Sequence, residues 1–251
     1  MPDPAITMRV IFSRKGFDSA AGGGASPIVN GRPLSLPIPA LTASRTNYGA
    51  LGLGGYVGRA SRGRYGADSL CHHDPMFLPD GTCLFGQVGA AQSHLANQGV
   101  EPGDVFLFFG LFREEATGEP HHRIFGYLHV SEVVHLAHCS AQRVAELARH
   151  DHPHALAMHG KDDAVYVGEG RTARHASDLL RLTVPGGPLT LWRPPGWLQP
   201  GNLTYHRRTE RWLPDGLLKA APRGQEFVAD IADLPDAHAW LQTIVAEINR
   251  S

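Results

Sequence analysis

The run Val105-Phe106-Leu107-Phe108-Phe109-Gly110-Leu111-Phe112-Arg113 is the most apolar stretch of this chain. A continuous apolar run of this length is typical of a strand that is buried on both faces. A turn at residues 101–104 precedes it, and a second apolar run at residues 123–130 follows a polar loop. We therefore predict a buried β-hairpin at the centre of the fold. Gly126 within the second run indicates a β-bulge or a close backbone approach there.

Further strands and helices are predicted from periodicity on either side of this hairpin. Residues 8–12 and 164–167 are short β-branched runs, which are typical of strands. Asn30-Gly31 is a strong signal for a tight hairpin turn, and the prolines of residues 32–39 confine the second arm to a sheet edge. Apolar residues at helical spacing predict three short helices, over residues 90–98, 141–150 and 236–249.

The composition adds long ordered loops to these elements. Hydrophobic residues make up 42% and charged residues 19% of the 251 residues, so the chain can bury a core. With 29 glycines and 19 prolines we expect many turns, and we predict irregular loops over residues 42–66 and 185–201. No repeat or linker divides the sequence. We therefore predict one α+β domain over residues 1–251, with a mixed, mostly antiparallel sheet, few short helices and long Gly/Pro-rich loops.

The charge balance and the cysteine content exclude several classes of protein. A formal net charge of -1 excludes a global polycation, so contact with nucleic acid requires a local basic patch, a single nucleotide or a flipped base. Three cysteines without a C-x-x-C pair indicate neither a disulfide framework nor a zinc knuckle. Residues 1–4 lack a signal-peptide start, and no apolar run approaches the ~20 residues of a membrane span. We expect a cytoplasmic protein without a membrane partner; its cofactors and oligomeric state stay unknown from the sequence.

A dense group of polar side chains lies shortly before the central strand. It comprises Cys71-His72-His73-Asp74-Pro75 and Gly86-Gln87-Val88-Gly89-Ala90-Ala91-Gln92-Ser93-His94-Leu95. Neighbours along an extended backbone point to opposite faces, so Cys71 with His73 and His72 with Asp74 form two separate pairs. This alternation argues against a nucleophile made of adjacent Cys and His. No HExxH-like ligand spacing is present, and we assign no metal ligand.

The polar side chains of this group favour acid–base chemistry. His73 or Asp74 would move a proton on a base or sugar, as imidazoles and carboxylates do near neutral pH. Gln87 and Gln92 would read the edge of a base, since a carboxamide both donates and accepts hydrogen bonds. His94 is a further nucleotide-binding candidate on the same segment. The alternative is structural: Asp74-Pro75 begins a turn, and the two glutamines satisfy buried backbone groups.

The loop after the first strand is the predicted phosphate site. It reads Ser13-Arg14-Lys15-Gly16-Phe17-Asp18-Ser19 and is followed by Gly22-Gly23-Gly24. Two cations beside glycines suit a phosphate, because backbone N–H groups at glycines can converge on an anion, although the GK[ST] of a Walker loop is missing. A flexible surface turn is the alternative. Asp18 joins His73 and Asp74 as a catalytic candidate, and the predicted phosphate ligands are Ser13, Arg14, Lys15 and Gly16.

Several stretches spread along the chain share one family resemblance. They are residues 11–19, 26–28 with 33–39, 73–75, 86–92, 103–110 and 223–228. Together they resemble the nucleotide modification associated domain 3 family. The resemblance implies a role in the modification of nucleotides, DNA bases in particular. It implies no particular reaction, and the catalytic candidates above come from the residues themselves.

A second resemblance covers only the central hairpin. Residues 103–108 followed by 124–130 are similar to the strand pattern of PUA-like domains that bind modified bases. This implies a partly open PUA-like barrel, and as an alternative function a non-catalytic reader of modified nucleic acid. Such a reader would hold phosphates through Arg59, Arg62 and Arg64.

The leading prediction is an enzyme that acts on a nucleobase or nucleotide by acid–base chemistry. Its expected partner is a nucleotide or a nucleic acid that carries a modified base. Besides the reader, a metal-dependent hydrolase of nucleic acid or nucleotide is a third possibility. The enzyme requires the phosphate loop around Arg14 and Lys15 to share one pocket with His73 and Asp74.

Overall fold

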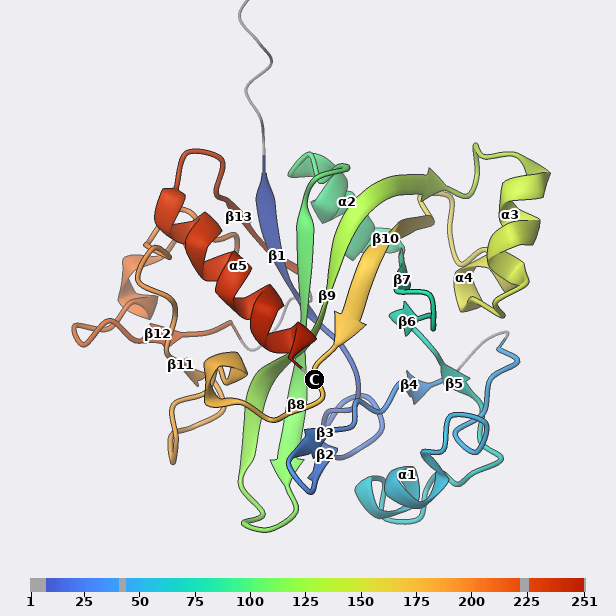
Figure 1. The fold of residues 1–251 in the computed structure, drawn as a ribbon, viewed down its shortest axis with the longest axis horizontal. Coiled ribbons are helices and arrows are strands. Elements are labelled where there is room, and N and C mark those ends of the chain that lie inside the picture. The colour runs from blue at the N-terminus through green and yellow to red at the C-terminus, as the bar shows by residue number, and fades with distance from the viewer. Residues whose placement is uncertain (1–7, 41–43, 222–225, 251) are drawn as a thin grey trace, which may run out of the picture.

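The fold is built on one large curled sheet (Figure 1). The computed structural model describes residues 8–40, 44–221 and 226–250, so the predictions for residues 1–4, 42–43 and 223–225 lie outside the described residues. Within the described ranges nine strands form this sheet. Their order is β13 (Glu226–Asp230), β1 (Arg9–Arg14), β8 (Val105–Glu114), β9 (Pro120–His135), β10 (Ala164–Thr172), β7 (Thr82–Gln87) and β6 (Met76–Phe77). In addition, β2 (Ser26–Val29) pairs with β8, and β3 (Arg32–Pro33) pairs with β2.

The pairing confirms the predicted mixed, mostly antiparallel sheet. Strand β8 runs parallel to β1 and to β2, whereas the other neighbouring strands described for this sheet pair antiparallel. The sheet bends into a half-barrel, and the helix α5 (Pro235–Asn249) crosses one of its faces (Figure 1). An α+β fold with a partly open barrel is therefore what the chain adopts.

Strand β8 is buried on both faces, as its sequence predicts. Alternate residues face two different cores. Val105, Leu107 and Phe109 pack in the cluster that contains the apolar face of α5. Phe106 and Phe108 pack in the opposite cluster, with residues of β7, β10 and the helix α2 (Gly89–Asn97). This two-sided burial explains why the run contains no alternation of polar and apolar residues.

The central hairpin is confirmed, and β9 is longer than predicted. Phe108 pairs with Gly126 and Phe109 with Ile124, so Phe125 is the extra residue of a β-bulge. A side chain at position 126 would place its Cβ 2.9 Å from the carbonyl oxygen of Arg171, which explains the glycine. Strand β9 continues past the hairpin because its second half pairs with β10.

The three predicted helices are confirmed within one or two residues at each end, as α2, α3 (Ala141–Ala148) and α5. The predicted hairpin at Asn30-Gly31 is also confirmed, as the pair β2–β3. The prediction of an irregular loop over residues 42–66 was wrong for α1 (Gly54–Ala60). That helix contains three glycines, which have a low helix propensity. It is stabilised by the burial of Val57 against Phe17 and Tyr48.

The remaining elements are short, and several of them carry the site described below. These elements are β4 (Ile38–Pro39), β5 (Cys71–His72), α4 (Pro153–Leu156), β11 (Leu191–Trp192), β12 (Leu218–Lys219) and the 3₁₀ turns η1 (Asp178–Leu180) and η2 (Thr209–Arg211).

No helix of the described ranges is long and apolar enough to span a bilayer.

Two adjacent histidines of β9 are buried. Burial is the main cause that lowers the pKa of His121 to about 4, helped by the charges of Arg123 and Arg181. Burial also lowers the pKa of His122 to about 4, helped by Arg14. Both imidazoles are neutral in the folded protein at pH 6, whereas in the unfolded chain a histidine takes up a proton near pH 6.5.

We expect the free energy of unfolding to fall as the pH is lowered from 6.5 to 4. The unfolded state binds more protons over this window, so each buried histidine costs up to about 3 kcal/mol by pH 4. Urea denaturation at several pH values measures this loss. His122→Gln should remove part of the slope, and an unchanged slope in that variant would contradict the assignment.

Candidate functional site

A pocket of about 420 Å³ opens where β1 and β7 end. It brings the predicted phosphate loop and the predicted catalytic stretch together, because Arg14 and Lys15 line it with Asp74 and Gln87. Among the described residues, the lining is Arg14, Lys15, Gly16, Asp18, Ala21, Ile38, His72, Asp74, Gly86, Gln87, Val88, His154 and His159.

A buried carboxylate joins the two sides of this pocket. Strands β1 and β7 are separated by three strands in the sheet, yet both reach Glu226 at the start of β13. Its Oε1 accepts from Lys15 Nζ at 3.0 Å, from Gln87 Nε2 at 2.5 Å and from Ser13 Oγ at 3.1 Å. The sheet must curl for β7 to come within reach of β13, so the pocket is a product of that curvature.

Burial governs the electrostatics of this carboxylate. Glu226 is 1% exposed, and desolvation raises its pKa although the Lys15 ammonium and the hydrogen bonds act in the opposite direction. Its Oε2 has no hydrogen-bond partner among the described residues. The Lys15 ammonium also lies 4.3 Å from the centre of the Phe85 ring. Lys15 is thereby held at the pocket wall by an ion pair and a cation–π contact.

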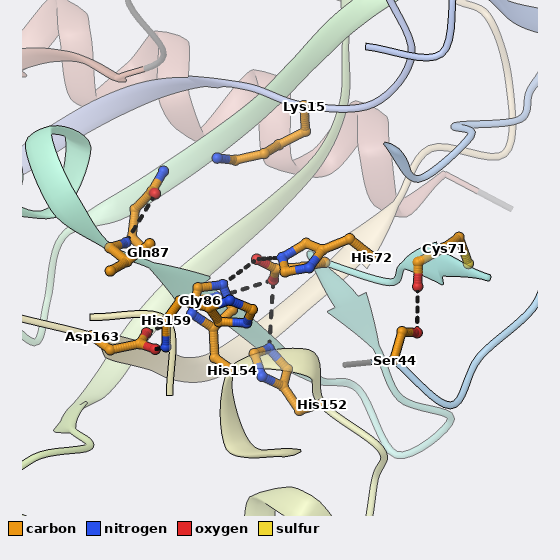
Figure 2. Close-up of polar contacts among 12 residues, drawn as sticks. Lys15, Ser44, Cys71, His72, Gly86, Gln87, His152, His154, His159 and Asp163 are labelled. Atoms are coloured by element: carbon orange, nitrogen blue, oxygen red, sulfur yellow. Dashed lines mark hydrogen bonds and ion pairs between the residues drawn. The ribbon is translucent and has the colours of Figure 1, made fainter. Parts of the chain in front are cut away.

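Asp74 is the centre of a group of imidazoles. Figure 2 shows three of them, His72, His152 and His154, close together. Its Oδ1 accepts from the backbone N–H of Gly86 at 3.0 Å and lies 3.5 Å from His152 Nε2. Its Oδ2 lies 3.7 Å from Nε2 of both His72 and His154. Burial alone would raise the pKa of Asp74, but the surrounding imidazoles hold it well below its usual range. Asp74 is therefore an anion at neutral pH.

A second carboxylate fixes the orientation of His154. Asp163 Oδ1 lies 2.5 Å from His154 Nδ1, and its Oδ2 accepts from the backbone N–H of His159 at 2.7 Å. The side chain of Asp163 is fully buried. This contact assigns the proton of His154 to Nδ1, so the lone pair of Nε2 faces Asp74 and the pocket.

The same group has the donor set of a metal site. One ligand atom each from His72, Asp74 and His154 lies within 4.8 Å of the other two. Two imidazoles and a carboxylate can hold Fe(II), Zn(II) and related ions.

Comparison with known families identifies the chain. The family model described as nucleotide modification associated domain 3 matches residues 9–230. The chain belongs to this family. Comparisons with curated proteins and with solved structures found no match. The matched range spans β1 to β13 and contains every residue of the pocket, so the pocket is part of the nucleotide modification associated domain.

The structure of this domain brings His72 rather than His73 into the pocket. The alternation predicted for residues 71–74 is present: His72 and Asp74 share the pocket, and Cys71 is buried in a small apolar cluster. His73 instead lines a neighbouring cavity of about 250 Å³ with Pro33 and Phe77, where burial lowers its pKa. The sequence shows that His72 and His73 diverge, but it does not show which side faces the site.

Three other predicted residues lie outside the pocket lining. Ser13 is buried against Glu226. Gln92 is buried on α2 and accepts from the Tyr166 hydroxyl at 3.0 Å. His94 lies 3.1 Å from the Thr204 hydroxyl. In these contacts Gln92 and His94 serve packing around α2, and Ser13 supports the carboxylate behind the pocket.

The remaining predicted residues line the pocket in distinct ways. Gly16 has φ +81°, a value that suits glycine. Asp18 Oδ1 accepts from the backbone N–H groups of Ala20 and Ala21, so it shapes the turn of its own loop. Arg14 donates to the Ala221 carbonyl at 3.3 Å, and burial lowers its pKa.

Besides His72, five site residues were not predicted. Four of them lie on one short segment, with the spacing His152-x-His154, then His159 and Asp163. Glu226 lies in residues 223–228, one of the stretches that carry the family resemblance. The missed residues are His152, His154, His159, Asp163 and Glu226.

Gly86→Ala is expected to displace His154 from the site. An added Cβ would lie 2.2 Å from Cδ2 of the His154 ring, so the ring must move, at a cost of about 1–3 kcal/mol in unfolding free energy. Proton NMR should show the downfield Nδ1–H signal of His154, identified by its absence in His154→Gln, lost or shifted in Gly86→Ala. Gly66→Ala is the matched control, since nothing lies within 4 Å of an added Cβ there. An unchanged signal in Gly86→Ala would show that the contact is absent in solution.

Proposed function

We propose that this protein is an enzyme that acts on a nucleotide or a nucleobase. Arg14 and Lys15 bind the phosphate, and the reaction takes place beside Asp74 and its histidines. The observation that carries the proposal is the single pocket that contains both groups. Its volume of about 420 Å³ suits a small ligand, since such pockets span roughly 300–1,000 Å³. The family description, nucleotide modification, supports the same ligand class.

Two different cations form the proposed phosphate site. Lys15 is a compact charge fixed by Glu226, and Arg14 presents a planar guanidinium that can bind two oxygens at once. Gly16 follows them in a left-handed backbone conformation and lines the same pocket.

Gln87 is held in a fixed orientation for contact with a base. Its Nε2 donates to Glu226, and its Oε1 accepts from the backbone N–H of Val88 at 3.2 Å. One N–H and one lone pair of the carboxamide are left for a ligand. This remaining pair suits a base edge that presents an acceptor beside a donor.

The reacting end provides groups that transfer protons. The imidazoles of His72 and His159 line the pocket on the side of Asp74. An imidazole can accept a proton from a base or sugar and return it later, and the Asp74 anion stabilises the imidazolium that forms. We propose proton transfer on the bound nucleotide as the chemistry of this site.

The lining favours an enzyme over a reader of modified bases. Readers commonly stack a base on aromatic rings, whereas the described lining of this pocket has no Phe, Tyr or Trp. The arginines predicted for a reader lie elsewhere: Arg59 pairs with Glu115 at 3.2 Å, and Arg59 and Arg62 line a different cavity of about 410 Å³.

Calorimetry with paired ligands tests the phosphate site. Wild-type protein should bind a nucleoside 5′-monophosphate roughly ten- to a hundredfold more tightly than the nucleoside, because a charge-assisted hydrogen bond contributes about 1.5–3 kcal/mol. Lys15→Met should reduce this ratio, and Lys161→Met, at an exposed lysine, should not. If Lys15→Met folds poorly because Glu226 is left unpaired, Lys15→Met/Glu226→Gln removes both charges. Equal affinity of wild-type protein for the two ligands would sink the proposed phosphate site.

Asp74→Asn tests the reacting end. The change keeps the shape of the side chain and removes its charge, so nucleotide binding should persist while turnover falls at least a hundredfold. Mass spectrometry of nucleotides and digested DNA incubated with each variant detects the modified product. Turnover that survives in Asp74→Asn would place the reaction elsewhere.

A further inference from the structure

The imidazoles around Asp74 stand too far from it for ordinary hydrogen bonds. An N–H···O bond is usually no longer than about 3.2 Å, whereas the distances from Asp74 to His72, His152 and His154 are 3.5 to 3.7 Å. Yet the side chain of Asp74 is only 4% exposed, and burying an anion is costly unless a partner compensates it. A group that draws these atoms together is needed to complete the site.

A single cation meets that requirement. Imidazole and carboxylate ligands lie about 2.0–2.2 Å from a bound zinc ion, so neighbouring ligand atoms around one ion are about 3–3.5 Å apart. The Nε2 atoms of His72 and His154 each lie 3.7 Å from Asp74 Oδ2, a few tenths of an ångström beyond that spacing, and all three atoms lie within 4.8 Å of one another. Side-chain movements that shorten these separations would bring all three to one ion.

Neighbouring residues already orient two of these ligands, His154 and Asp74. Asp163 holds His154 through Nδ1, which is the carboxylate–histidine arrangement that directs Nε2 toward a metal. On the other side, the Gly86 N–H donates to Oδ1 of Asp74, and His152 Nε2 lies 3.5 Å from the same oxygen, so Oδ2 is the oxygen presented to the ion. His152 is fully buried, and its Nδ1 has no hydrogen-bond partner among the described residues.

The geometry points to a divalent first-row transition-metal ion bound by His72 Nε2, Asp74 Oδ2 and His154 Nε2. Because these three residues also line the pocket, the remaining coordination positions face it and can take water or a ligand oxygen. Fe(II), Co(II) and Zn(II) share this donor chemistry. Asp163 and His152 are positioning residues.

The metal changes the chemistry proposed for His72. As a ligand, His72 no longer carries protons, and metal-bound water becomes the proton-transfer group, since a bound cation lowers the pKa of its water. This catalytic part rests on the proposed function. The metal site itself does not, because it follows from the ligand geometry alone.

Metal binding is measured on tag-free protein that has been stripped with a chelator. Calorimetric titration with Zn(II), with Co(II), and with Fe(II) under anaerobic conditions should each show one ion per chain, with relative affinities that identify the preferred metal. The intensity of the Co(II) absorption bands reports the coordination number. A rise in melting temperature on metal addition shows that the folded protein is what binds.

Variants locate the site. His72→Gln, Asp74→Asn and His154→Gln should each weaken binding at least a hundredfold, and Asp163→Asn ten- to a hundredfold, as is typical of residues that orient a ligand. His138→Gln, at an exposed histidine outside the pocket lining, should bind like wild type. If His154→Gln does not fold, His72→Gln remains usable, because the His72 side chain is 21% exposed.

Two results overturn the metal site. One is the absence of stoichiometric binding to wild-type protein, and the other is equal binding by wild type and the three ligand variants, which would mean adventitious surface sites. The nucleotide proposal fails on a different result: metal-free wild-type protein would show no Lys15-dependent preference for a nucleoside monophosphate over the nucleoside.

Discussion

The buried carboxylate of Glu226 ties together parts of the molecule that are far apart in sequence and in the sheet. It accepts from Ser13 and Lys15 beside it and from Gln87 across the curl. Three donors on one oxygen offset part of the cost of burying the charge. Without this carboxylate, Lys15 and Gln87 would lose their common anchor, and the two walls of the pocket would no longer be positioned relative to each other.

The sequence predicts the centre of this fold well because local patterns determine it. The type of each element can be predicted from a short window, because the apolar run from Val105 to Arg113 indicates a buried strand and the spacing in residues 236–249 indicates a helix. Helix α1 and the short α4 could not be predicted in this way. The first is rich in glycine and depends on packing against Phe17 and Tyr48, which only the folded chain provides.

For the candidate site, too, the residues marked by local sequence could be predicted, and those brought in by the fold could not. Residues 14–16, Asp18, Asp74 and Gln87 could be predicted as pocket residues, because loop composition and polar density are visible in short windows. The choice between His72 and His73 could not, since alternation separates two faces without saying which face meets the pocket. His154 and Glu226 lie about eighty and one hundred and fifty residues from Asp74. Only the contact of α4 with β7 brings His154 to Asp74, and only the curl of the sheet brings Glu226 to Gln87.

Among the described residues, the lining of the pocket is close to electrically neutral. Its ionised side chains are two cations, Arg14 and Lys15, and two carboxylates, Asp18 and Asp74. Glu226 behind Lys15 makes the balance still less positive, so without a metal ion a phosphate is held by the local charges and hydrogen bonds of Arg14 and Lys15 rather than by the net charge of the pocket. A divalent ion beside Asp74 would make the same pocket strongly electropositive. Nucleotide and ion would then strengthen each other's binding by the same factor, as thermodynamic linkage requires.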